Sequence, residues 1–219
     1  MRFFNGGGLR GQSYVVYVIW AALLLSLVVS LFNANWSLSF LALATLLMST
    51  LPALFASWFK IHLPVSFFAA IVVFIFGTIF LGEAYDFYER YWWWDIALHG
   101  GSAVGFGLVG FVFVFMLFEG DRYAAPPWAI ALFGFCFATM IGMVWEIFEF
   151  SMDQIFGLNM QKSGLVDTMW DLIVDMAGAF FGASAGVAYL KGRSRLGLPG
   201  LIKEFISKNR RFFSKSDEN

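Results

Sequence analysis

The sequence predicts an all-α membrane protein, a polytopic transmembrane bundle of about six helical spans. Of its 219 residues, 60% are hydrophobic and only 13% are charged, whereas soluble proteins carry about 25% charged residues. The mean hydropathy is +0.74. Phe occurs 28 times and Trp 9 times, which is typical of lipid-facing helices with aromatic residues at the headgroup level.

Six apolar stretches reach the length of about 20 residues that a helical span needs. They cover residues 14–32, 36–59, 62–81, 95–118, 128–150 and 167–190. Pro52 predicts a kink in the second span, and Pro64 falls in the first turn of the third, where proline is tolerated. No small-residue cleavage site follows the first stretch, so we interpret it as a retained span. These spans form one predicted membrane domain, residues 1–190, followed by a basic tail, residues 191–219.

The basic residues predict the orientation. Eight of the 14 Lys and Arg residues lie in the tail, and Arg2 and Arg10 precede the first span, so both termini are expected in the cytoplasm. The longer connections, residues 83–94 and 151–166, then lie outside, and the second is a loop or a re-entrant hairpin. The tail segment LIKEFISKNRRFF is either solvated or lies on anionic lipid as an amphipathic stretch.

Ten of the 15 acidic residues lie in residues 83–95 or 146–175, near the predicted outer ends of spans four to six. Helical spacing sorts the acids of the spans into three polar stripes. The stripes are Asp95 and His99 on the fourth span, Glu146, Glu149 and Asp153 on the fifth, and Asp167, Asp171 and Asp175 on the sixth. Ionisable groups at membrane depth are costly and usually face the bundle interior. We therefore expect a shared polar cluster that faces away from the cytoplasm.

Some of these residues have simpler interpretations. Asp95 and Asp167 would also serve as helix N-caps, and the acids of residues 83–89 as solvated interfacial groups. Cys136 is interpreted as a packing residue. Small-residue ridges, Gly101 to Gly105 and Gly178 through Gly182 to Gly186, predict close contact involving the fourth and sixth spans.

Only Arg90 and Lys162 accompany the ten acids on the predicted outer side. Some carboxylates are therefore protonated, or a metal is bound, or a cationic substrate is taken up. Carboxylates with one imidazole and no thiolate suit Mg²⁺, Mn²⁺ or Zn²⁺. The predicted metal ligands are His99, Glu146, Glu149, Asp171 and Asp175, and the predicted catalytic residues are these five together with Asp95.

The segments WWWDIALHGGSAVGFGLVGF, WEIFEFSMDQ and DTMWDLIVDMAGAFFGASAG resemble the YjdF-type family of bacterial integral membrane proteins, and more distantly VanZ-like proteins. The resemblance covers residues 92–186. It rests on Asp95 and His99, on Glu146 and Glu149, and on Asp167, Asp171 and Asp175 with Gly178 and Gly182. The chain departs from the VanZ-like pattern with Glu149 in place of glutamine and with no basic residue before the aspartate helix. The resemblance implies a multi-pass protein of the bacterial cytoplasmic membrane.

Three functions stay open at this point. The first is a metal-dependent enzyme acting on a lipid or lipid-linked envelope substrate, with a carboxylate as general base. The second is a cation or proton transporter, against which the one-sided distribution of acids counts. The third is a non-catalytic protein with a structural polar network. The metalloprotease motif HExxH does not occur. Membrane lipids are the expected partners, no nucleic-acid partner is expected, and the oligomeric state is left open.

Overall fold

The computed structural model describes residues 11–118, 125–193 and 197–213, and these residues form helices and no strands. Six helices are long and apolar enough to cross a membrane, which confirms the predicted fold class. They are Tyr14–Phe32, Trp36–Trp58, Val65–Ala84, Trp94–Phe118, Pro127–Phe156 and Leu165–Leu190.

The chain divides into two compact units, which are described separately. Among the described residues, the first comprises 11–94 with 207–209, and the second comprises 95–118, 125–193, 197–206 and 210–213. The division of the sequence into one six-span domain, 1–190, and a tail, 191–219, stays a prediction.

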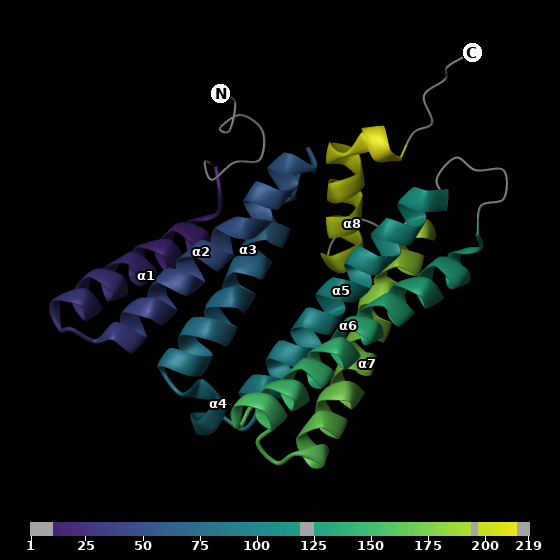
Figure 1. Cartoon of the computed structure of the whole chain (residues 1–219). Coiled ribbons are helices and arrows are strands. Elements are labelled where there is room, and N and C mark those ends of the chain that lie inside the picture. The colour runs from purple at the N-terminus through teal and green to yellow at the C-terminus, as the bar shows by residue number, and fades with distance from the viewer. Residues whose placement is uncertain (1–10, 119–124, 194–196, 214–219) are drawn as a thin grey trace. The chain divides into compact units, whose positions relative to one another are not determined.

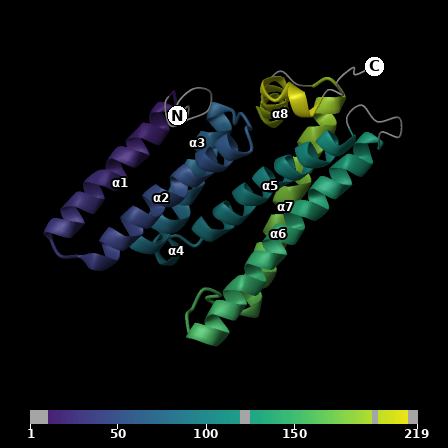
Figure 2. The ribbon, with the colours of Figure 1, turned by 45° about the horizontal axis from the view of Figure 1, so that its top comes forward.

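In the first unit, α1 (Tyr14–Phe32), α2 (Trp36–Trp58) and α3 (Val65–Ile75) lie side by side (Figures 1 and 2). The side chains of Ser13 and Asn35 accept hydrogen bonds from backbone N–H groups in the first turns of α1 and α2, a common N-cap arrangement. Apolar residues such as Leu23, Phe68 and Val72 form the core. The Trp20 indole donates to the Ser49 hydroxyl at 2.9 Å between α1 and α2.

The third span differs from its prediction at both ends. It begins at Val65 rather than at residue 62, because proline disfavours helical backbone in the residue before it. Beyond Ile75 it continues as a π-helix, η1 (Phe76–Ala84), so Glu83 belongs to the helix and not to the following connection. That connection contains the short helix α4 (Phe87–Arg90).

The second unit is built from α5 (Trp94–Phe118), α6 (Pro127–Phe156) and α7 (Leu165–Leu190), followed by α8 (Gly197–Lys208) and the 3₁₀ turn η2 (Arg210–Phe212). Figures 1 and 2 show α5, α6 and α7 packed together. The predicted loop 151–166 is half helical, since α6 continues to Phe156 and ends at Gly157 in the left-handed conformation (φ 66°). Glycine favours this helix-terminating geometry.

The predicted tail is also partly helical, because α8 includes most of the segment that the sequence marks as amphipathic. Several residues on which the predicted orientation depends, Arg2, Arg10, Arg195 and Lys215, lie outside the described residues. The orientation of the termini stays a prediction.

Candidate metal centre

Glycines bring the three helices of the second unit into close contact. A Cβ atom on Gly107 of α5 would lie 2.8 Å from the Ala179 carbonyl oxygen of α7, and one on Gly178 would lie 2.6 Å from the Gly100 carbonyl oxygen. A Cβ on Gly134 of α6 would lie 2.7 Å from a backbone nitrogen of α5. Such small-residue contacts allow helix backbones to approach closely.

The predicted contact between the fourth and sixth spans is thus confirmed, with one correction. The ridge on α7 is the predicted one, but Gly101 and Gly105 of α5 have open space beside them, and Gly100 and Gly107 make the contact instead. Cys136 is exposed, so its interpretation as a packing residue is wrong.

His99 lies at the centre of the polar cluster. Its Nδ1 donates to the Asp175 carboxylate, with N–O distances of 3.3 Å and 3.4 Å to the two oxygens. Its Nε2 faces the other way and lies 3.9 Å from Asp95 Oδ1 and 3.9 Å from Glu146 Oε1. One imidazole from α5 therefore joins carboxylates from all three helices.

The position of the Asp175 carboxylate depends on a glycine of the neighbouring helix α6. A Cβ on Gly142 of α6 would contact Asp175 Oδ2 and lie 2.8 Å from Asp175 Cγ. The carboxylate thus fills the space that the missing Gly142 side chain leaves. Such a carboxylate, hydrogen-bonded to one nitrogen of a histidine, fixes the ring so that the other nitrogen can bind a metal.

The carboxylates on the Nε2 side of His99 are buried but incompletely paired. Glu146 is 4% exposed and Asp171 is 3% exposed. Within the described part of the chain, both oxygens of Glu146 and Oδ2 of Asp171 have no hydrogen-bond partner. The Thr168 hydroxyl lies close enough to influence the Glu146 carboxyl but does not complete a hydrogen bond to either of its oxygens. Buried polar atoms of native proteins are nearly always paired with protein groups or ordered water, so these three oxygens are available to accept from water or to coordinate a cation.

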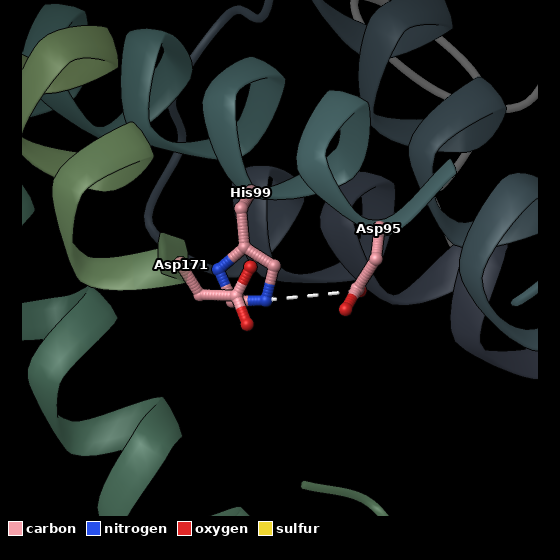
Figure 3. A group of neighbouring side chains, drawn as sticks. All are labelled: Asp95, His99 and Asp171. Carbon is pink, nitrogen blue, oxygen red and sulfur yellow. Dashed lines mark ion pairs between the residues drawn. The ribbon is translucent and has the colours of Figure 1, made fainter. Parts of the chain in front are cut away.

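Asp95, His99 and Asp171 can supply one ligand atom each, and these atoms lie within 4.8 Å of one another. Figure 3 shows the three side chains converging, with His99 and Asp95 from successive turns of α5 and Asp171 from α7. Carboxylate oxygens and imidazole nitrogen are suitable ligands for Mg²⁺, Mn²⁺ and Zn²⁺. Asp95, predicted from the sequence only as a catalytic residue, therefore belongs to the candidate metal ligands.

The Asp95 side chain is 26% exposed, whereas those of His99, Glu146 and Asp175 are 8% exposed or less. The cluster is therefore open at Asp95, near the start of α5, and closed at Asp175.

The remaining acids of the three stripes lie beside the cluster or serve the loop. Glu149 accepts a hydrogen bond from the Trp145 indole at 2.9 Å. Asp153 accepts hydrogen bonds from the backbone nitrogens of Met160 and Gln161 at 2.7 Å and 2.9 Å, and so organises the connection to α7. Asp95 lies inside the first turn of α5, and Asp167 lies inside the first turn of α7, whose N-cap is Gly164. The interpretation of Asp95 and Asp167 as N-caps is therefore wrong.

Sequence reasoning missed two supporting groups. Gly142 gave no signal, because it belongs to neither glycine ridge. Gln161 donates from its side-chain amide to the Thr168 hydroxyl at 2.5 Å, which ties the loop to the first turns of α7. The Gln161 contact requires the fold of the loop and could not be read from spacing.

Comparison with known proteins places the chain in a family. Residues 13–192 match the family described as "Predicted membrane protein (DUF2238)". The chain belongs to the DUF2238 family. All residues of the polar cluster lie within the matched region, and the six apolar helices of this DUF2238 protein are consistent with a multi-pass membrane protein.

A relative from Thermotoga maritima, named "Uncharacterized protein", is 31% identical over 115 residues, which are 52% of this chain and 57% of the relative. The chain thus spans little more than half the length of that relative. No solved structure matches this DUF2238 protein.

Proposed function

We propose that this protein is a membrane-embedded, metal-dependent enzyme that acts on a lipid or lipid-linked substrate. The observation that carries the proposal is the set of unpartnered, buried carboxylate oxygens of Glu146 and Asp171 on the Nε2 side of His99. A divalent cation satisfies these oxygens and offsets the charge of the cluster at once.

The residues have distinct proposed roles. His99 Nε2, Asp95 and Asp171 hold the ion, with Glu146 as a fourth ligand or as the general base. Asp175 orients His99, and Glu149, tied to Trp145, lies at the edge of the cluster. A divalent ion would supply Lewis-acid activation of water. Structural metal sites are closed whereas catalytic sites keep an open position, so the exposure of Asp95 favours catalysis over a purely structural network.

The buried faces of α5 and α7 beyond the polar cluster argue against transport. Beyond Asp175 the buried residues of α7 are all glycine or alanine, and beyond His99 those of α5 are Ala103, Gly107, Leu108, Gly110 and Phe111. An ion leaving the cluster along these faces would meet no polar side chain among the buried residues described. A site that is open at one end suits a substrate that enters and leaves by the same side.

A lipidic substrate is supported by the surroundings of the ligands. Trp145 and Trp170 precede Glu146 and Asp171 in sequence, and they are 45% and 58% exposed. Exposed apolar side chains beside a polar site can contact acyl chains while the ligands contact the head group. With the predicted orientation, the site faces the outer leaflet of a bacterial cytoplasmic membrane. The YjdF-type resemblance agrees with that location, and a VanZ-like link to the cell envelope is a hypothesis for the substrate.

Elemental analysis of the purified protein tests the metal site. We expect about one divalent ion per chain in the wild type and in an Asp86→Asn control, because Asp86 is an exposed acid paired with Arg90. The His99→Ala, Asp171→Ala double variant and the milder Glu146→Gln variant should lose most of it. Full metal content in both variants would refute the site.

Catalysis is tested by incubating the metal-loaded protein with a bacterial lipid extract and following the lipids by mass spectrometry. We expect a lipid to be converted by the wild type and not by Glu146→Gln. If the protein binds metal but converts no lipid, while proteoliposomes release the loaded ion, the protein is a transporter and the enzyme proposal is wrong.

A further inference from the structure

A second charged feature of the second unit lies far along the chain from the metal ligands. After α7 ends at Leu190, exposed basic residues follow on three successive segments. We call them the basic surface: Lys191, Arg193, Lys203, Arg210 and Arg211. The one acidic residue within 191–193 and 197–213 is Glu204, which is half-buried.

The segments that carry the basic surface are fixed to the bundle by apolar contacts. Ile202 of α8 is 2% exposed and belongs to the same hydrophobic cluster as Phe111 of α5 and Ala185 of α7. Leu198 and Ile206 of α8 pack against that cluster. The apolar face of α8 is therefore covered by the unit itself, and Lys203 lies on its exposed side.

The turn after α8 is anchored in the same place. The Phe213 ring stacks on the Phe115 ring of α5, with 6.0 Å between centroids, and lies edge-on to Phe205 of α8 at 6.3 Å. The Phe115 ring also contacts Tyr189, near the end of α7, at 6.2 Å. The turn η2, which carries Arg210 and Arg211, is thereby held near the C-terminal ends of α5 and α7. Figure 1 shows this last helical segment, in yellow, beyond α8.

The basic surface begins where a candidate membrane span ends. Lys191 and Arg193 directly follow a 26-residue apolar helix, so they are placed at the boundary of the span and not in distant solvent. Long basic side chains near the ends of spans extend toward the headgroups. Here the tail returns over the bundle and adds three further cations at that same end.

We propose that the basic surface is a binding site for anionic phospholipid headgroups of the adjacent leaflet. The charge of the surface is complementary to such lipids, and each Lys or Arg near an anionic membrane surface contributes about fivefold in affinity. This site is independent of the proposed metal enzyme, since it shares no residue with the polar cluster and lies at the other end of α5 and α7.

The test uses the full chain in a neutral detergent, titrated with phosphatidylglycerol or phosphatidylcholine. Binding is followed by native mass spectrometry and by the shift in melting temperature. The wild type should prefer phosphatidylglycerol at least about tenfold, and the preference should disappear at about 1 M salt, where the screening length is about 3 Å.

Two variants locate the site. One is the triple variant Lys203→Gln, Arg210→Gln, Arg211→Gln, and the other is the double variant Lys191→Gln, Arg193→Gln. Each should weaken phosphatidylglycerol binding at least about fivefold. The matched control, Arg90→Gln with Lys162→Gln, removes two cations elsewhere and should bind as the wild type does. Replacement of the same lysines by arginine and arginines by lysine should retain binding, which separates charge loss from misfolding.

Three results would overturn the proposal. The first is equal binding of both lipids by the wild type. The second is an unchanged preference in both location variants. The third is full competition by soluble glycerol phosphate, which would identify a free phosphate ligand and not a lipid surface.

Discussion

Gly142→Ala is the most informative single perturbation, because it changes the metal centre without removing any polar group. The new Cβ would contact Asp175 Oδ2 and lie 2.8 Å from its Cγ, so the carboxylate must move. Its hydrogen bond to His99 Nδ1, now 3.4 Å long, would be lost or lengthened. His99 would then no longer be held with Nε2 toward Asp95 and Glu146.

Loss of a carboxylate that orients a metal-binding histidine typically weakens metal affinity by about 10- to 100-fold. Each factor of ten corresponds to about 1.4 kcal/mol, so the expected loss is about 1.4–2.8 kcal/mol of binding free energy. Asp175→Asn should cost less, because the amide oxygen can still accept from Nδ1. His99→Ala removes a ligand and should cost more than either.

The assay is titration of chelator-treated protein with Mn²⁺, followed by electron paramagnetic resonance of the free ion. If Gly142→Ala binds Mn²⁺ as tightly as the wild type while His99→Ala does not, Asp175 does not orient the ring. If Asp175→Asn instead abolishes binding as fully as His99→Ala, Asp175 is itself a ligand, as the sequence analysis expected.

Three further predictions concern orientation, packing and the loop. A cysteine at Asn159 in a Cys136→Ser background should react with an impermeant thiol reagent on intact cells, and labelling only after lysis would reverse the predicted orientation. Gly182→Leu should destabilise the protein by about 1–3 kcal/mol, measured by thermal unfolding, because the new side chain would meet the Val104 carbonyl oxygen of α5. The control Gly105→Leu has open space beside it and should leave the melting temperature unchanged. Asp153→Ala removes two backbone contacts of the α6–α7 loop and should speed amide exchange there; protection equal to the wild type would show that the loop does not depend on Asp153.

The spans could be read from the sequence because a bilayer sets a minimum length for an apolar helix. Helix ends that carry polar residues could not be located in the same way, because they are not apolar. The stretch 151–156 contains Ser151, Asp153 and Gln154, so hydropathy falls although α6 continues. Gly157 was the available signal, since a glycine after the last periodic residue commonly ends a helix. The glycine ridge of α5 was misplaced for a related reason: neighbouring residues point about 100° apart, and spacing alone does not give the rotation of the helix.

The cluster was predicted in outline, because a period of 3.6 residues puts the acids of each stripe on one face. Spacing alone could not decide which members meet. Glu149 is turned about 60° from Glu146 around the helix axis, enough to bring it to Trp145. Asp153 shares the face of Glu146 but lies about 10 Å further along the axis, so it reaches the loop instead. The contacts of His99 with three helices depend on glycine packing that the stripes do not encode.

The unpartnered oxygens of the cluster support the proposal of a bound cation. A protonated carboxyl needs an acceptor for its proton, just as a carboxylate needs a donor. Within the described residues neither kind of partner meets the two oxygens of Glu146 or Oδ2 of Asp171, and each such buried atom costs about 1–3 kcal/mol. His99 is one imidazole shared among Asp95, Glu146 and Asp175, so it cannot satisfy them all. A divalent ion beside Nε2 would coordinate the unpartnered oxygens directly and needs no further donor from the protein.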